Sequence, residues 1–245
     1  MWDIMPESAS TFAGDIDGMI KLITYIVGAW AAAAYLIFFF FLFAYRRRDG
    51  VRSKYVTGSG KQALWVLLPV LAVSAFDFGI DIKNTPIWNH AKLYLPESGQ
   101  VVRMNAKQWA WEFTYPGPDG QLDTADDVRS LNMLHVKVDE PVKFELVAED
   151  VLHSLSIPVM RVKQDAIPGR KILGWFEPIK TGEWDIQCAE ICGIGHTVMA
   201  ARIKVHSADE FEKAMAILSR DKGSATMQTA ALLADPNMFE REITE

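Results

Sequence analysis

The sequence predicts two membrane-spanning helices followed by an all-β domain with a Greek-key sandwich. Two long apolar runs, residues 19–45 and 63–82, are each long enough to cross a bilayer as a helix. After residue 99 the pattern changes to short stretches in which apolar and polar residues alternate, which is typical of half-buried strands. With 245 residues, 50% of them hydrophobic, the chain is large enough for one modest globular domain besides the membrane segments.

The loop between the apolar runs predicts the orientation of both helices. Residues 46–62 carry the bases Arg46, Arg47, Arg48, Arg52, Lys54 and Lys61 against the single acid Asp49. Such a bias is typical of cytoplasmic loops, so we expect the leader, residues 1–17, and the globular domain on the outer side. The leader contains acids and no Lys or Arg, which agrees. The first run is too long for a signal-peptide core and has no basic region before it, so we expect retained helices at residues 18–45 and 63–83.

A connector, residues 84–98, is expected to join the second helix to the globular domain, residues 99–206. We expect Pro86 and Pro96 to break any regular element in this connector. The clearest strand patterns of the domain are residues 101–105, 134–138, 142–147 and 202–205, with turn formers between them. Many short strands with such turns indicate a Greek-key sandwich. In the last segment, residues 207–245, we expect a short helix capped by Ser207 and a tail that lies on partner subunits.

One loop, residues 188–199, brings together side chains that bind soft metals. It holds the chain's two cysteines, Cys188 and Cys192, followed by His196 and Met199. Thiolate and thioether sulfur favour copper, and imidazole binds copper or zinc. The expected additional ligand is His153, at the end of an apolar run that predicts a strand. Taken alone, the loop is also compatible with a disulfide or a zinc site.

Several blocks in the same order resemble subunit II of haem-copper cytochrome c oxidases, over residues 18–206. The blocks are Gln108-Trp109-Ala110-Trp111, residues 149–154, residues 164–170 and the loop 188–199. The resemblance narrows the expected fold to a cupredoxin and implies a dinuclear copper centre, CuA. Its implied ligands are His153, Cys188, Cys192, His196, Met199 and the backbone carbonyl of Glu190. It also implies that the Glu190 side chain binds a Mg ion shared with the catalytic subunit, and Mg often takes only one or two protein carboxylates.

The resemblance further implies the subunit of a terminal oxidase that receives electrons from a c-type cytochrome. These electrons would pass to haem in subunit I, which reduces oxygen to water and translocates protons. The implied point where the electron enters is Trp109, and Trp111 lies two residues on in the same expected strand. Expected partners are subunit I, other membrane subunits, the cytochrome and membrane lipid, with no nucleic acid, in a bacterial inner membrane with the copper domain on the periplasmic side. The sequence contains no Cys-x-x-Cys-His motif, so the electron must come from a separate haem protein.

Two alternatives remain open at this point: a CuA subunit of a nitric oxide reductase, and a membrane-anchored copper-binding protein. A quinol-oxidase subunit with a purely structural cupredoxin fold would lack the metal ligands that are present here. The chain also departs from the family pattern. Ala110 stands where Tyr is common, and Gln62 stands where a Glu near the proton uptake route is common, so proton uptake at that position is in doubt.

Three further groups have both a structural and a functional interpretation. The acidic turn, residues 119–127, is a solvated turn, a Ca site or a docking face for a cationic cytochrome, and the net charge of -6 permits the last. Asp165 and Arg170 form either an internal ion pair around Pro168 or a contact with the haem-bearing subunit. The remaining histidines, His90, His135 and His206, are expected to be ordinary surface or core residues.

Overall fold

The computed structural model describes residues 5–52, 58 and 60–220, and the chain divides into two units. One unit is Gly14–Leu93, and the other combines Met1–Ala13 with Tyr94–Glu245. The N-terminal leader therefore belongs to the same unit as the globular domain. Three of the expectations above lie outside the described residues: the placement of the tail after Arg220, the contribution of Lys54 to the basic loop, and the first residues of the leader.

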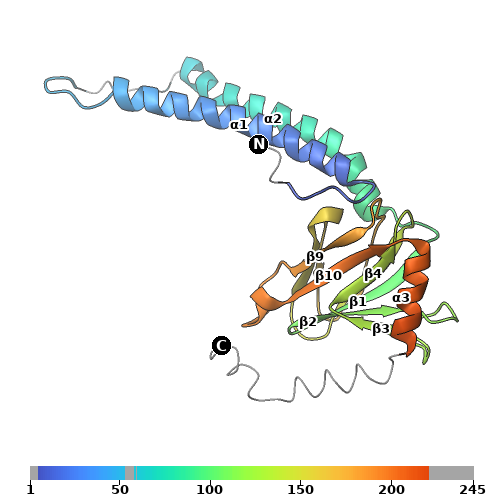
Figure 1. Cartoon of the computed structure of the whole chain (residues 1–245). Helices are drawn as coiled ribbons and strands as arrows, with labels where there is room; N and C mark the ends of the chain where they lie inside the picture. The colour runs from blue at the N-terminus through green and yellow to red at the C-terminus, as the bar shows by residue number, and fades with distance from the viewer. Residues whose placement is uncertain (1–4, 53–57, 59, 221–245) are drawn as a thin grey trace. The chain divides into compact units, whose positions relative to one another are not determined.

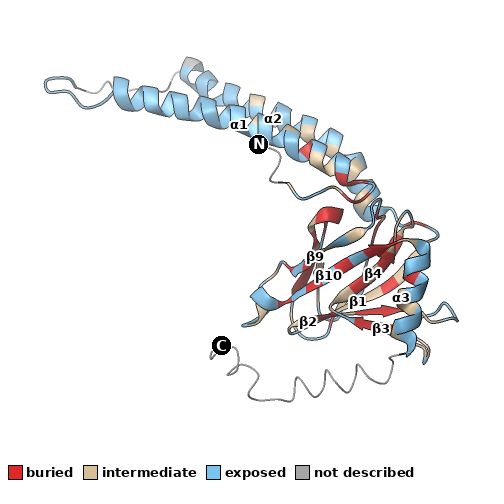
Figure 2. Cartoon of the chain, in the orientation of Figure 1, coloured by how far each residue is buried: buried red, intermediate tan, exposed pale blue. Residues whose placement is uncertain are grey.

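The first unit consists of two long apolar helices. They are α1 (Ala13–Ala44) and α2 (Gly60–Trp88), and a π-helical turn, η2 (Asn89–Leu93), follows α2. Both are long and apolar enough to cross a membrane, and nearly all their large apolar side chains are exposed (Figure 2). Trp30 of α1 packs edge-on against Phe76 of α2, with 6.1 Å between ring centroids. Two apolar helices followed by a β-domain confirm the predicted fold class.

The helix boundaries differ from the expected ones. The first helix begins at Ala13 rather than at residue 18, and the second continues past residue 83. Pro86 does not break the chain: it lies inside α2, as does Pro69. A proline removes one N–H donor from the helix, and here the turn widens into η2 directly after it, so helical backbone continues to Leu93.

The second unit contains a sandwich of two five-stranded sheets (Figure 1). The first sheet has the order β3-β2-β1-β5-β8, from β1 (Gln100–Lys107), β2 (Ala110–Tyr115), β3 (Val128–Leu131), β5 (Val142–Ala148) and β8 (Ile172–Phe176). The second has the order β4-β10-β9-β6-β7, from β4 (Met133–Lys137), β6 (His153–Ile157), β7 (Val162–Ala166), β9 (Gly182–Cys188) and β10 (Ala200–His206). The pairs β1/β5 and β4/β10 are parallel, and the other pairs are antiparallel. This arrangement is the cupredoxin-like sandwich that the sequence predicts.

Alternating side chains of the strands fill the space between the sheets. In β5 every second residue is buried, and β10 alternates in the same way over most of its length. The fully buried side chains include Met104, Trp111, Phe113, Leu146 and Phe176 from the first sheet and Leu134, Leu155, Ile186 and Ile203 from the second. Burial of this apolar area, at about 25 cal/mol per Å², is the main contribution to the stability of the sandwich.

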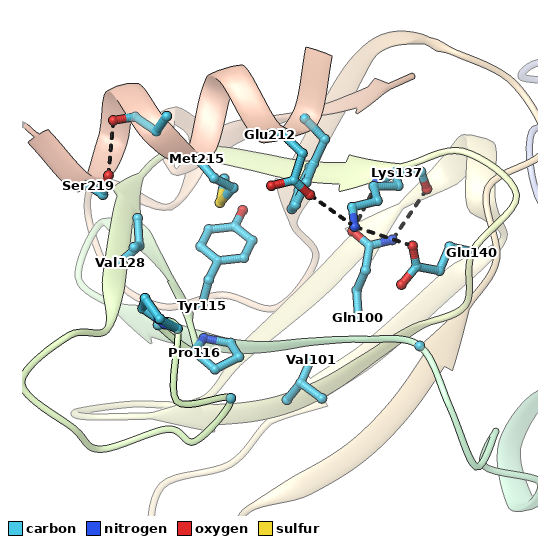
Figure 3. A pocket seen from close by; sticks show the side chains of 16 residues that line it. Gln100, Val101, Tyr115, Pro116, Val128, Lys137, Glu140, Glu212, Met215 and Ser219 are labelled. Carbon is cyan, nitrogen blue, oxygen red and sulfur yellow. Dashed lines mark hydrogen bonds and ion pairs between the residues drawn. The ribbon is translucent and has the colours of Figure 1, made fainter. Parts of the chain in front are cut away.

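The helix α3 (Ala208–Arg220) covers the edge formed by β3 and β4 (Figure 1). Its start is a capping box, because the backbone N–H and the hydroxyl of Ser207 both donate to the Glu210 carboxylate, at 3.1 and 2.9 Å. Phe211 is its buried anchor. Beneath the helix, Tyr115 and Met215 help to line a cavity of about 590 Å³, whose rim carries Lys137 between Glu140 and Glu212 (Figure 3).

Residues 6–12, which we call the N-terminal strap, are bound to the β-domain. Ala9 N–H donates to Val159 O at 2.9 Å, and Ile179 N–H donates back to Ala9 O at 2.9 Å. Ser10 is buried and donates its hydroxyl to Met160 O at 2.8 Å. Ala9, Ser10 and Phe12 are all buried, so the strap is an integral part of the domain.

Two residues that flank the helical unit in the sequence contact one indole of the β-domain. Phe12, at the end of the strap, and Tyr94, just after η2, each pack edge-on against Trp175 of β8, with 5.5 Å between ring centroids in both cases. Edge-to-face aromatic pairs contribute about 0.5–1.5 kcal/mol each beyond their buried area. Trp175 thus anchors the chain both before the first helix and after the second.

Candidate metal centre

The metal loop, residues 188–199, connects β9 to β10 and is closed at its base. Cys188 is the last residue of β9, and its N–H donates to Met199 O at 3.2 Å. A short 3₁₀ helix, η4 (His196–Val198), turns the chain, with His196 N–H donating to Gly193 O at 3.1 Å. Because the loop leaves and rejoins adjacent strands, the side chains at both of its ends face the same space.

The structure brings all six sequence-predicted ligands together. The two sulfur atoms of Cys188 and Cys192 are 3.8 Å apart. Cys188 Sγ lies 3.9 Å from His153 Nδ1 and 3.3 Å from Glu190 O. Cys192 Sγ lies 3.5 Å from His196 Nδ1 and 3.7 Å from Met199 Sδ. Each cysteine is therefore accompanied by one imidazole and one weaker donor.

This donor set distinguishes between the alternatives that the sequence left open. A disulfide requires sulfur atoms about 2.05 Å apart, whereas Cys188 and Cys192 are free, buried thiols. A structural zinc ion takes four ligands in a tetrahedron, and six donors converge here. Two thiolates, two imidazoles and a thioether are the soft donors that copper prefers. The residues present therefore fit soft metal ions, which Cys188, Cys192, His153, His196 and Met199 would hold.

The buried environment keeps the Cys192 thiol protonated in the metal-free chain. Burial, reinforced by the neighbouring thiol of Cys188, raises the pKa of Cys192 to about 11. A metal ion binds the thiolate, so its binding must release this proton. In the metal-free chain Cys192 is therefore a weak nucleophile at neutral pH, because the thiolate is the reactive form.

A carboxylate that the sequence did not single out orients His153. The imidazole is fully buried, and its Nε2 lies 2.8 Å from Asp150 Oδ1, which leaves Nδ1 facing Cys188. Partial burial acts to raise the pKa of Asp150, but hydrogen bonds from His153 and from the N–H groups of Gln108 and Val151 lower it overall. Carboxylates in this position fix the tautomer and the ring orientation of metal-bound histidines. His153 begins β6 rather than ending a strand, which corrects the expectation from sequence.

Two tryptophans lie close to the candidate ligands. Trp109 is half-buried over the loop glycines, and a Cβ atom added at Gly195 would overlap its indole ring. Trp111 is fully buried and packs edge-on against His153, with 6.3 Å between ring centroids. Trp109 is thus the more exposed of the two, and Trp111 supports the ligand from behind.

The Glu190 side chain lies beside a cationic residue of β7. Its carboxylate is 3.4 Å from Lys163 Nζ, and the same ammonium is 3.5 Å from Asp165. Asp165 also accepts a hydrogen bond from Ser154 Oγ at 2.8 Å. Among the described residues, Asp165 therefore pairs with Lys163 and Ser154, and the ion pair expected with Arg170 is not formed.

The other residues singled out in the sequence lie away from the metal loop. In the acidic turn, the carboxylate of Asp123 is bound by Arg103, and Asp126 accepts hydrogen bonds from Asp119 N–H and Thr124. These contacts give the acidic turn a structural role. The Ca site and the docking face for a cytochrome stay predictions. His135 and His206 are not isolated, since His135 Nδ1 and His206 Nε2 are 2.8 Å apart across β4 and β10.

Comparison with known proteins links this domain to one family of respiratory proteins. Residues 100–206 match the family model described as cytochrome c oxidase subunit II, periplasmic domain. The alternative cytochrome c oxidase subunit 2 of Bradyrhizobium diazoefficiens is 29% identical over 224 residues, covering 81% of this chain and 78% of that protein. The cytochrome c oxidase subunit 2 of Cereibacter sphaeroides is 25% identical over 263 residues, covering 94% and 83% respectively. The crystal structure of the periplasmic domain of subunit II of cytochrome oxidase of Bradyrhizobium japonicum is 26% identical, covers 52% of this chain and 99% of that chain, and superposes with a TM-score of 0.47.

Proposed function

Because its globular domain belongs to the cytochrome c oxidase subunit II family, we propose that this chain is the subunit of a terminal oxidase that receives electrons from a c-type cytochrome. It passes them to haem in the catalytic subunit, where oxygen is reduced to water and protons are translocated. The observation that carries the proposal is the pair of buried sulfur atoms, 3.8 Å apart, each with its own imidazole. A single-metal site has no need of this duplicated arrangement.

The proposed ligands of the dinuclear copper are His153, Cys188, Cys192, His196, Met199 and the carbonyl of Glu190. Copper held by these residues would supply a one-electron acceptor and donor, and a rigid set of ligands would keep the change in geometry small when an electron arrives or leaves. The protein contributes a rigid arrangement of these ligands. Asp150 holds His153 in one orientation, and the hydrogen bond from Cys188 N–H to Met199 O keeps the two ends of the loop together. Burial of both thiols excludes water from the sulfur atoms.

The proposed path of the electron begins at Trp109. Its indole lies against the metal loop at Gly193 and Gly195, so it connects the outer surface of the domain with the thiolates. The Glu190 side chain, beside Lys163, is the proposed half-site for a Mg ion shared with the catalytic subunit. A carboxylate on the ligand loop would then connect the metal centre directly to that interface.

The N-terminal strap supports the proposed topology. The strap precedes α1, the β-domain follows α2, and the two are hydrogen-bonded to each other. If both helices cross the membrane, the strap and the domain lie on the same side, which requires the basic loop between the helices to lie on the other side. With that loop in the cytoplasm, the metal centre faces the periplasm, where a c-type cytochrome can reach it.

The proposal is tested by purifying the complex that contains the full-length chain and measuring its metals and spectra. We expect two copper ions per chain in addition to any copper of the catalytic subunit, and an electron paramagnetic resonance signal of one electron shared equally by two copper nuclei. Stoichiometric zinc, or the signal of a single copper ion, would exclude the proposed centre. Oxygen consumption driven by a reduced c-type cytochrome, without nitric oxide consumption, separates an oxidase from a nitric oxide reductase.

A further inference from the structure

Gln108 contacts both halves of the metal-ligand set. It lies between β1 and β2, directly before Trp109, and its side-chain Nε2 donates a hydrogen bond to Cys192 O at 2.6 Å. Its backbone N–H donates to Asp150 Oδ2 at 2.7 Å. The other oxygen of that carboxylate holds His153 Nε2 at 2.8 Å. Gln108 thus connects the backbone at Cys192 with Asp150, the carboxylate that orients His153 beside Cys188.

The Trp109 indole has no polar contact of its own that could fix it to the metal loop. Its Nε1 is buried and has no hydrogen-bond partner among the described residues. Its ring packs over Gly193 and Gly195, where the absence of side chains lets the two segments approach closely. The hydrogen bond from Gln108 to Cys192 O, which joins residues 84 positions apart in the sequence, is therefore the polar contact that holds this close approach together.

We propose that Gln108 is a positioning residue that holds the metal loop against the Trp109 indole and thereby sets the rate of electron transfer from the indole to the metal centre that this loop would hold. This inference rests on the proposed function. In the step concerned, one electron would leave the ferrous haem of the donor, which would become ferric, and would reduce the oxidised copper centre that Cys188 and Cys192 would hold. No bond is broken and no proton moves, so the rate depends on how closely and how often the indole and the loop are in contact.

A neutral amide suits this position better than a charged side chain. Gln108 is exposed and lies beside the carboxylate of Asp150, so a negative side chain here would be repelled both by that carboxylate and by the Cys192 carbonyl oxygen. The amide donates its hydrogen bond without adding charge to the face that a donor protein would meet. Gln108→Leu and Gln108→Glu therefore remove the same contact in two ways, one neutral and one repulsive.

The test compares these two variants with Gln100→Leu in the complex containing the full-length chain. Gln100 lies at the opposite end of β1, where its side chain makes a comparable pair of hydrogen bonds with the Lys137 backbone, at 2.9 and 3.4 Å. Reduced mitochondrial cytochrome c is the probe, and its oxidation is followed over a range of concentrations and ionic strengths. Loss of one hydrogen bond changes the population of a closed loop by about two- to tenfold, so we expect the rate at saturating cytochrome to fall by about that factor in Gln108→Leu and further in Gln108→Glu. The concentration for half-saturation in Gln108→Leu, the copper content of both variants and all properties of Gln100→Leu should match the wild type.

A second readout does not depend on bound metal. In the metal-free full-length chain, the Cys192 thiol should react with iodoacetamide faster by about the same two- to tenfold in Gln108→Leu, because the loop opens more often. Wild-type rates in both measurements, with the paired-copper signal present, would overturn the inference and leave the proposed function intact. A rise in the half-saturating concentration alone would overturn it too, by placing Gln108 in the docking surface. A wild-type chain without the paired-copper signal would overturn the proposed function and this inference together.

Discussion

Asp150 Oδ1 and His153 Nε2 are 2.8 Å apart, so the buried imidazole is locked with Nδ1 towards Cys188. Loss of a carboxylate that supports a metal-bound histidine typically lowers metal affinity about 10- to 100-fold. We therefore expect Asp150→Ala to lose copper to a chelator at about 10- to 100-fold lower chelator concentration than the wild type. Asp185→Ala, which removes an exposed carboxylate of β9, is the control and should retain copper as the wild type does. Equal retention in both variants would show that Asp150 has no part in holding the ligand.

Substitution of Cys192, a strong ligand, and of Met199, a weak ligand, should have different effects on the metal centre. In Cys192→Ser a hydroxyl replaces one of the two proposed bridging thiolates, and we expect the shared-electron signal to disappear. In Met199→Leu the strong ligands remain, so copper should be retained. A weakly bound thioether tunes the potential rather than holding the metal, so its removal should shift the reduction potential. Potentiometric titration and electron paramagnetic resonance spectra decide both cases, and an unchanged spectrum in Cys192→Ser would contradict a thiolate bridge.

The role of Trp109 can be tested with two substitutions that act on the same contact. Trp109→Gln removes the indole, and we expect oxidation of reduced cytochrome c to fall by orders of magnitude while copper content and salt-dependent docking stay near those of the wild type. Gly195→Ala keeps the indole but places a methyl group where the ring lies, so it should slow oxidation without removing a ligand. If turnover is unchanged in both, or is lost only together with copper, Trp109 is a structural residue.

The His135 and His206 pair should make stability dependent on pH. Burial, with a smaller contribution from His206, lowers the pKa of His135 to about 4 from its usual value of 6.5, and burial also lowers the pKa of His206. The folded state therefore resists protonation that the unfolded state accepts, and stability should fall as the pH drops from 6.5 towards 4. We expect a loss of roughly 1 to 2 kcal/mol over this range, measured by denaturation at several pH values. His135→Gln is the control variant, and its stability should depend less on pH; identical slopes would contradict the assignment.

The proposed topology predicts which engineered cysteines a membrane-impermeant thiol reagent can reach. In cells with a permeabilised outer membrane, Asp119→Cys in the globular domain should be labelled, whereas Arg48→Cys between the helices should not. The unsubstituted chain gives the background from the buried Cys188 and Cys192. Labelling confined to Arg48→Cys would invert the orientation and place the metal centre on the side opposite to a periplasmic donor.

The sequence was most informative where function depends on residue types at close spacing. Four of the side-chain ligands lie within residues 188–199, so their chemistry can be read without knowing the fold. The strands were equally predictable from sequence. A strand with one face packed into the sandwich must be apolar at every second residue.

The contacts that support the site were not predictable, because they join distant segments through ordinary polar groups. The bond from Gln108 to Cys192 spans 84 residues, and the contact between His135 and His206 spans 71. Neither residue pair has a local pattern that distinguishes it from a solvated side chain. At Pro86 a local pattern was present but gave the wrong prediction. Proline usually ends a helix, whereas here α2 continues past Pro86 and is followed by the wider π-helical turn η2.

The N-terminal strap also constrains the order in which the protein can be made. Ser10 leaves the ribosome early, but its hydrogen-bond partner Met160 is 150 residues further along the chain. The strap therefore has no binding site until both helices and most of the β-domain have been synthesised. Closure of the strap is thus a late step in maturation, and it becomes available only to chains whose leader and domain have reached the same compartment.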